Sequence, residues 1–144
     1  MRRFVCLLAV VLLVAPSLGS DAPKKYDGAT VDELEGTWQM VAVDDGGGPG
    51  ALPPVGTQTF RAGTWARSFG GSTDTGTYTT DTSHVPAYLT ETYFDQDGKA
   101  WTLYYIFRID GDTLKIARYG RWKPRPKRFD EENLFTVVWR RVKK

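Results

Sequence analysis

The feature that most constrains this chain is a succession of about eight short segments with the composition of β-strands. Each is rich in aromatic and β-branched residues, and glycine, aspartate or proline separates one from the next. The segments are residues 36–44, 57–60, 64–69, 76–80, 88–94, 100–109, 113–117 and 134–142. Short strands at regular spacing, with almost no helical pattern, predict an antiparallel sandwich or an up-and-down barrel.

Two observations favour the barrel. The connections are mostly of hairpin length, with Asp-Gly pairs at 97–98 and 110–111, which favours a meander. The first and last segments are both strongly patterned, so leaving them as free edges would promote aggregation, and closure removes both edges. We therefore predict an all-β fold, an antiparallel up-and-down barrel of about eight strands over residues 34–144.

Residues 1–19 have the pattern of a secretory signal peptide. Two arginines precede an apolar run over residues 4–15, which is short for a membrane span. Small residues then fit cleavage after Gly19 or, nearly as well, after Ala22. An uncleaved anchor is the alternative. We expect an exported protein, periplasmic or extracellular, with no stable membrane span after cleavage.

Removal of the signal peptide changes the charge and the cysteine content. The chain has 19 Lys and Arg against 17 Asp and Glu, and the loss of Arg2 and Arg3 leaves 17 of each kind. Cys6 is the single cysteine and is lost as well, which excludes disulfides, thiolate metal sites and cysteine nucleophiles. The mature domain must therefore rest on its own core, and a chain of this length buries roughly two-thirds of its extended surface.

Two further stretches connect or precede strands. Residues 20–33 read as a polar linker and a short helical turn, in which Thr30 and Glu33 have the spacing of a capping box. The glycine- and proline-rich residues 45–56 do not match a phosphate-binding loop, because no Gly-Lys-Ser/Thr follows. They predict a flexible connection.

The first strand opens with Gly36-Thr37-Trp38, in "LEGTWQMVAVD". This Gly-x-Trp resembles the signature of lipocalins, whose tryptophan closes the base of the barrel beneath an arginine from near the end of the chain. Arg140 and Arg141 on the last strand are the candidates here, since a guanidinium packs favourably on an indole face. The resemblance implies a lipocalin-like β-barrel with Gly36, Trp38, Arg140 and Arg141 at its closed end.

A second resemblance covers nearly the whole mature chain. "LEGTWQMVAVDDGG", "GTYTTDTSHVPAYL", "YIFRIDGDTLKIA", "RPKRF" and the closing "VVWRR" are similar, in order and spacing, to the small exported lipocalin-like domain of planctomycetes. That family has no established activity, so the resemblance implies fold and export rather than function. This chain departs from it at Ala117, where the family often has Cys, and in "AYLTETYF" after Pro86, where the family pattern is apolar-Asp-apolar.

No catalytic or metal-binding constellation can be assembled from the sequence. His84 is the single histidine, which rules out a multi-histidine zinc site, and no nucleophile motif supports a Ser-His-Asp triad. Carboxylates cluster at Asp110 and Asp112 and at 130–132, and such pairs support glycosidase chemistry only on facing walls of a cleft. Asp110 and Asp112 flank Gly111, so a tight turn explains them better. The pairs at 95 and 97 and at 110 and 112 lack the length and terminal Glu of an EF-hand loop. We expect no enzymatic activity, no metal and no cofactor.

The sharpest local feature is the basic-aromatic segment, residues 118–129. Its cations and rings alternate without an acidic residue: Arg118, Tyr119, Arg121, Trp122, Lys123, Arg125, Lys127, Arg128 and Phe129. Outside the cytoplasm such a surface would meet an acidic polymer or a protein, and no nucleic acid is expected. The alternative is a solvated connection offset by the acidic residues 130–132, with Arg125 paired to a carboxylate and Phe129 packed on the end of the barrel.

The barrel interior is the other candidate site. Alternation from Trp38 places the following side chains inside: Met40, Ala42, Trp101, Leu103, Tyr105, Phe107, Leu114 and Ile116. They are bulky, so a filled core and a pocket are both consistent with the pattern, and a pocket would be lined by Met40, Trp101 and Tyr105.

Two functions from different classes follow. The first is a non-enzymatic carrier or sensor that holds a small apolar ligand in the barrel. The second is an interaction module with a filled barrel that binds a protein or an acidic polymer through the basic-aromatic segment.

Overall fold

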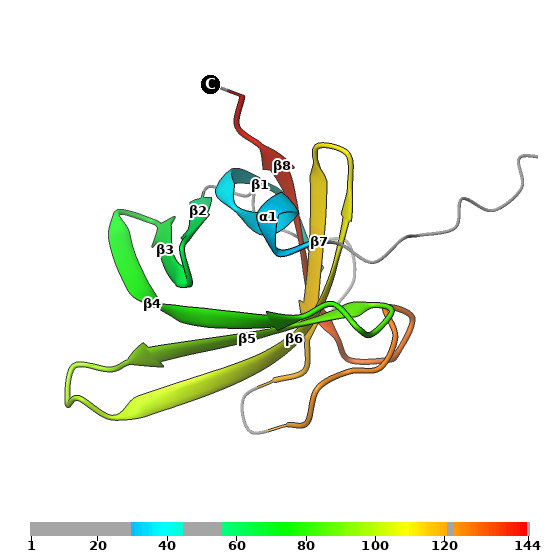
Figure 1. The fold of residues 1–144 in the computed structure, drawn as a ribbon. Coiled ribbons are helices and arrows are strands. Elements are labelled where there is room, and N and C mark those ends of the chain that lie inside the picture. The colour runs from blue at the N-terminus through cyan, green and yellow to red at the C-terminus, as the bar shows by residue number, and fades with distance from the viewer. Residues whose placement is uncertain (1–29, 45–55, 121–122, 144) are drawn as a thin grey trace, which may run out of the picture.

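A computed structural model describes residues 30–44, 56–120 and 123–143, in which eight strands form one closed antiparallel barrel (Figure 1). Each strand pairs with the next in sequence, and β1 pairs with β8 to close the ring. The elements are α1 (Val31–Leu34), β1 (Gly36–Asp44), β2 (Gly56–Arg61), β3 (Thr64–Phe69), β4 (Ser72–Asp81), β5 (Ala87–Phe94), β6 (Ala100–Asp110), β7 (Thr113–Arg118) and β8 (Phe135–Arg141). The predicted all-β up-and-down barrel is confirmed.

Several predictions from the sequence fall outside the described residues. These are the signal peptide with Cys6, the linker up to residue 29, the connection 45–55, and Arg121 and Trp122 of the basic-aromatic segment. No helix in the described ranges is long and apolar enough to cross a membrane.

β4 begins earlier than predicted because the turn before it is tighter. Gly70 and Gly71 have φ angles of 57° and 88°, a region that favours glycine, and they form a two-residue turn. Phe69 therefore pairs directly with Ser72, and the ladder resumes there rather than at Gly76.

The short helix α1 precedes β1 and is fixed by the predicted capping box. The Thr30 backbone N–H donates to Glu33 Oε2 at 2.7 Å, and the Glu33 N–H donates to Thr30 Oγ1 at 3.3 Å. The helix ends on Leu34, whose side chain is completely buried at one end of the barrel. In Figure 1 this turn of helix lies across the end of the barrel at which β1 begins.

One predicted inward position on β1 is wrong. Trp38 and Met40 are buried as expected, but Ala42 is exposed and Val43 packs on the core instead. The pairing with β8 shifts between Met40 and Ala42, which is the mark of a β-bulge at Val41. One extra residue reverses the alternation beyond it, so Ala42 points outward.

The closed half of the barrel is filled by large side chains. Trp38, Phe60, Leu89, Phe107 and Leu114 are at most 1 % exposed and belong to one contiguous cluster. Ile116 is buried in the same cluster, and Leu103 is partly buried against it. For this half, the filled core considered from the sequence is the one found.

A second apolar cluster lies outside the barrel wall. Ile106, Ala117 and Leu134 are buried there, and Tyr88, Tyr119 and Phe129 pack against them. Ile106 and Ala117 alternate with the inward residues of β6 and β7, so their side chains face outward. They are buried because the β7–β8 connection folds back over them (Figure 1). Phe129 therefore packs on the outer wall rather than on the end of the barrel, which corrects the expectation for this residue.

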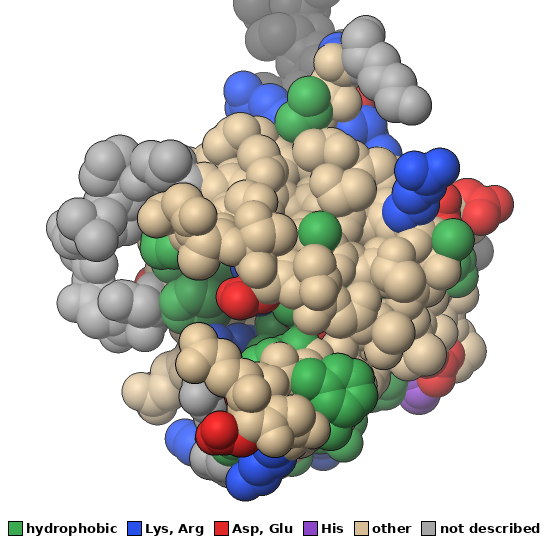
Figure 2. Space-filling model, turned by 90° about the vertical axis from the view of Figure 1, so that its left-hand side faces the viewer, with side chains coloured by type: hydrophobic (Ala, Val, Ile, Leu, Met, Phe, Trp, Pro, Cys, Tyr) green, Lys and Arg blue, Asp and Glu red, His purple; other side chains and the backbone are tan. Residues whose placement is uncertain are grey.

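The wall is incomplete between β6 and β7. β6 pairs with β5 from Ala100 to Phe107, but with β7 only from Ile106 onward. Among the residues that the structure describes, 100–105 thus have a strand neighbour on one side only, and we term this opening the β6–β7 seam. The side of the molecule that carries the β3–β4 turn and the tip of the β5–β6 hairpin is hollowed between them (Figure 2). Hydrophobic and basic side chains lie in that hollow.

Candidate ligand site between β6 and β7

The end of the barrel beneath α1 is sealed by Trp38. Its indole Nε1 donates to the Leu34 carbonyl at 2.9 Å, and its side chain is completely buried. The Arg141 guanidinium lies 4.1 Å from the indole centroid and donates to the carbonyls of Glu35, at 2.8 Å, and Glu33. Of the two arginines considered, Arg141 covers the tryptophan, whereas Arg140 is exposed.

Gly36 is where this arginine passes over the chain. Its φ is +124°, and a Cβ built on it would come within 3.1 Å of Arg141 Nη1. The backbone conformation therefore favours glycine, and a Cβ here would also press on the arginine side chain. Within the described residues, Leu34, Trp38 and Arg141 fill this end of the barrel.

A buried polar network crosses the interior above this plug. Glu91 on β5 is 0 % exposed and accepts from Gln58 Nε2 at 2.7 Å and from Arg67 Nη2 at 2.8 Å and 3.1 Å. Arg67 Nε donates to Gln58 Oε1 at 3.0 Å, and its guanidinium lies 5.0 Å from the Trp65 ring. Tyr105 on β6 is buried beside the pair.

The electrostatics of this network keep Arg67 charged and Tyr105 neutral. Burial alone would lower the pKa of Arg67, but Glu91 and Tyr105 together raise it above its ordinary value. Burial first, and then the Glu91 carboxylate, raise the pKa of Tyr105. The charge of Arg67 is therefore matched by Glu91 inside the protein.

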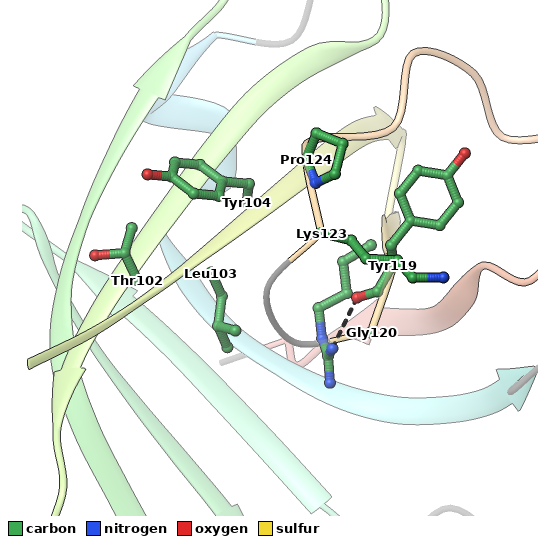
Figure 3. A pocket seen from close by; sticks show the side chains of 8 residues that line it. Thr102, Leu103, Tyr104, Tyr119, Gly120, Lys123 and Pro124 are labelled. Carbon is green, nitrogen blue, oxygen red and sulfur yellow. Dashed lines mark hydrogen bonds between the residues drawn. The ribbon is translucent and has the colours of Figure 1, made fainter.

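The described pocket lies at the β6–β7 seam and has a volume of about 430 Å³. Its walls come from β6, from the end of β7 and from the chain that follows, as Figure 3 shows. The lining residues are Thr102, Leu103, Tyr104, Arg118, Tyr119, Gly120, Lys123 and Pro124. Leu103 points to the opposite side of β6 from Thr102 and Tyr104, so the pocket joins the inner and outer faces of the wall (Figure 3).

Two anchors hold the outer wall of this pocket in place. Behind Tyr119, the phenol donates to the Glu131 carboxylate, which also accepts from the Lys127 and Arg128 backbone N–H groups at 2.6 Å each. The hydrogen bond from Tyr119 is the largest of the contacts that lower the pKa of Glu131. Glu131 is thus held as an acceptor, and it fixes the ring that lines the pocket.

The second anchor is Arg125. It donates to the carbonyls of Leu89, at 2.6 Å, and Tyr105, and to Thr90 Oγ1 at 2.7 Å. Its guanidinium also stacks on Tyr88, 4.5 Å from the ring centroid. The expected pairing of Arg125 with a carboxylate is therefore replaced by a clamp on β5 and β6, which holds the chain just after the pocket.

The described cations of the basic-aromatic segment point in different directions and do not form one surface. Arg125 is turned onto the barrel wall, and Arg128 forms an ion pair with Asp130 at 3.3 Å. Lys127 is exposed, whereas Arg118 and Lys123 line the pocket. Of the cations that the structure describes in this segment, two thus lie together at the seam.

The three residues predicted to line a pocket are not among those lining this one. Met40 belongs to the core, and Tyr105 belongs to the polar network and the core. Trp101 lies near the tip of the β5–β6 hairpin, where its Nε1 donates to Asp95 Oδ2 at 2.6 Å and Lys99 covers its ring. The alternation of apolar and polar residues predicts which side chains of β6 face inward, but not which of them lie beyond the end of β7.

The remaining candidates for chemistry are dispersed. His84 stacks on Tyr88 at 4.0 Å and lies 3.4 Å from Asp81. Asp110 and Asp112 flank the turn at Gly111, whose φ is 56°. Within residues 30–44, 56–120 and 123–143, no three His, Cys, Asp or Glu side chains come together as a metal site.

The fold and the sealed end define an eight-stranded up-and-down antiparallel β-barrel with one end plugged by tryptophan. Comparison with known proteins adds no relative: no protein-family model matches the chain, and neither a curated protein nor a solved structure is significantly similar to it.

Proposed function

We propose that this protein is a lipocalin-like carrier or sensor that holds a small molecule at the β6–β7 seam. The observation that carries this proposal is the pocket of about 430 Å³ where the wall opens. That volume falls in the range of small-molecule sites, about 300 to 1,000 Å³. The two anchors, Glu131 and Arg125, hold its outer wall in place before any ligand arrives, which lowers the entropic cost of binding.

The proposal includes export, to the periplasm or the extracellular space, and a role in binding rather than catalysis. The pattern of residues 1–19 supports export. The choice of binding over catalysis rests on the sequence, from which no catalytic constellation can be assembled. Five sequence blocks in matching order support a place in the planctomycete lipocalin-like family, although no family model matches the chain.

A small ligand is favoured over a polymer or protein bound along residues 118–129. A polymer would need several neighbouring free cations, and the described part of the segment has Arg125 turned inward and Arg128 paired with Asp130. Among the described cations of the segment, Arg118 and Lys123 both line the pocket. A pocket of this size fits one small molecule rather than an extended chain.

Native mass spectrometry of the protein purified from its own host, without organic solvent, tests the proposal. We expect an adduct of roughly a few hundred daltons, lost on denaturation. Gly120→Trp is the blocking variant, because Gly120 lines the pocket and a Cβ there meets no atom within 4 Å. Gly120→Ala is the matched control. A bare mass in repeated preparations, or an adduct that persists in Gly120→Trp, would overturn the proposal.

A further inference from the structure

The charge lining the pocket is one-sided. Among its described lining residues, Arg118 and Lys123 are cationic and none is acidic. In the barrel interior, by contrast, the charge of Arg67 is matched by Glu91, whose Oε2 lies 2.8 Å from Arg67 Nη2. The mature chain has as many acids as bases by count, so the local excess at the seam is a property of placement rather than of composition.

Arg118 is held in place while most of its donors stay uncommitted. It continues β7 on the inward side, and its guanidinium lies 5.0 Å from the Phe135 ring on β8. Nη1 donates to the Tyr119 carbonyl at 2.9 Å, the bond drawn in Figure 3. Within the described residues it forms no ion pair with a carboxylate. A guanidinium has five N–H donors, so further donors remain for a ligand.

Lys123 faces the same space from the chain that follows β7. Its Nζ lies 5.8 Å from the Tyr119 ring, and this ring is fixed from behind by Glu131. Leu103, Tyr104 and Pro124 supply apolar surface beside the two cations. The pocket thus combines flat apolar walls with two positive groups, which is the complement of an amphipathic anion.

We propose that the ligand is a small amphipathic monoanion, with its carboxylate or sulfonate group held by Arg118 and Lys123 and its apolar body against Tyr104 and Leu103. This inference deepens the proposed function and rests on it. Charge-assisted hydrogen bonds to an anion are about twice as strong as neutral ones, so the anionic group decides the affinity. A neutral molecule of the same shape keeps the apolar contacts and loses the ionic ones.

Two fluorescent dyes with the same aromatic body separate these contributions. 1-Anilinonaphthalene-8-sulfonate carries a sulfonate, and N-phenyl-1-naphthylamine is its neutral counterpart. We expect the anionic dye to bind at one site per chain and about tenfold more tightly than the neutral dye. Arg118→Gln should weaken the anionic dye by about tenfold and the neutral dye by less than about twofold, with a smaller loss for Lys123→Gln.

The controls keep the result interpretable. Arg140→Gln removes an exposed cation at the plugged end and should leave both affinities unchanged. Arg118→Lys keeps the charge and should restore part of the affinity for the anionic dye even if Arg118→Gln loses stability. A thermal unfolding curve for each variant separates lost binding from lost folding.

The outcomes distinguish the two proposals. If both dyes bind equally well and Arg118→Gln changes neither, the anionic ligand is refuted while the small-molecule site stands. If neither dye binds to the native protein and no adduct is found, the proposed function fails together with this inference. If the anionic dye alone is lost in Arg118→Gln and is partly restored in Arg118→Lys, the inference is supported.

Discussion

Replacing Trp38 with alanine tests whether the plug holds the barrel together. The side chain is completely buried, and deleting a buried large aromatic costs about 3 to 5 kcal/mol. The variant also loses the hydrogen bond to the Leu34 carbonyl, worth about 1 kcal/mol, and the packing of Arg141 on the ring, worth about 0.5 to 1 kcal/mol. Since these contributions overlap at one site, we expect the free energy of unfolding to fall by about 4 kcal/mol.

Urea denaturation followed by tryptophan fluorescence measures this loss, because four other tryptophans remain as reporters. Trp38→Phe keeps most of the volume but removes the indole N–H, so we expect an intermediate loss of about 2 kcal/mol. Trp101→Ala, on the hairpin and only half-buried, is the matched control and should cost about 1 kcal/mol. A loss below about 1 kcal/mol for Trp38→Ala would refute the assignment of Trp38 as the plug.

Three further predictions follow from described contacts. Glu91→Gln should lower the free energy of unfolding by about 2 kcal/mol in urea denaturation, because its arginine partner is left without a counter-charge. The folded state lowers the pKa of Glu131, so ionised Glu131 stabilises the fold. This stabilisation is fully present above the pKa of Glu131 in the unfolded chain, about 4.3, and is lost as the pH falls through its lower pKa in the folded protein. Carboxyl NMR titration should therefore show the Glu131 pKa rising in Tyr119→Phe, and an unchanged value would refute the contact. Gly76→Ala should cost about 3 kcal/mol, since its Cβ would lie 2.1 Å from a backbone oxygen, whereas Gly120→Ala should change stability by less than about 0.5 kcal/mol in thermal unfolding.

The strands and the closure of the barrel could be predicted because their signals are local. Alternation gives the inward face of each strand, and Asp-Gly and Gly-Gly pairs mark the turns. The bulge at Val41 has no such signal, because a strand with one extra residue has the same kind of composition as a regular strand. This is why Ala42 was placed on the wrong side.

The same alternation could also have predicted a buried carboxylate inside the barrel. In "AYLTETYF", Leu89 and Glu91 have the same parity, so an inward Leu89 implies an inward carboxylate that must find a partner. The β6–β7 seam could not be predicted from the sequence, because it depends on where β7 ends beside β6. The clamp of Arg125 likewise depends on the path of a connection that has no periodic pattern.

The pairing of β1 with β8 sets the order in which the fold can assemble. Every other ladder joins consecutive strands, whereas Gln39 pairs with Arg140 near the far end of the chain. Contacts of such separation carry the largest loop-closure entropy, so they slow folding. A growing polypeptide that lacks residues 135–141 can pair its first seven strands into a curved sheet, but Trp38 then has no arginine over it and both edges stay bare. Barrel closure therefore depends on residues 135–141, and removing them opens the molecule rather than shortening it.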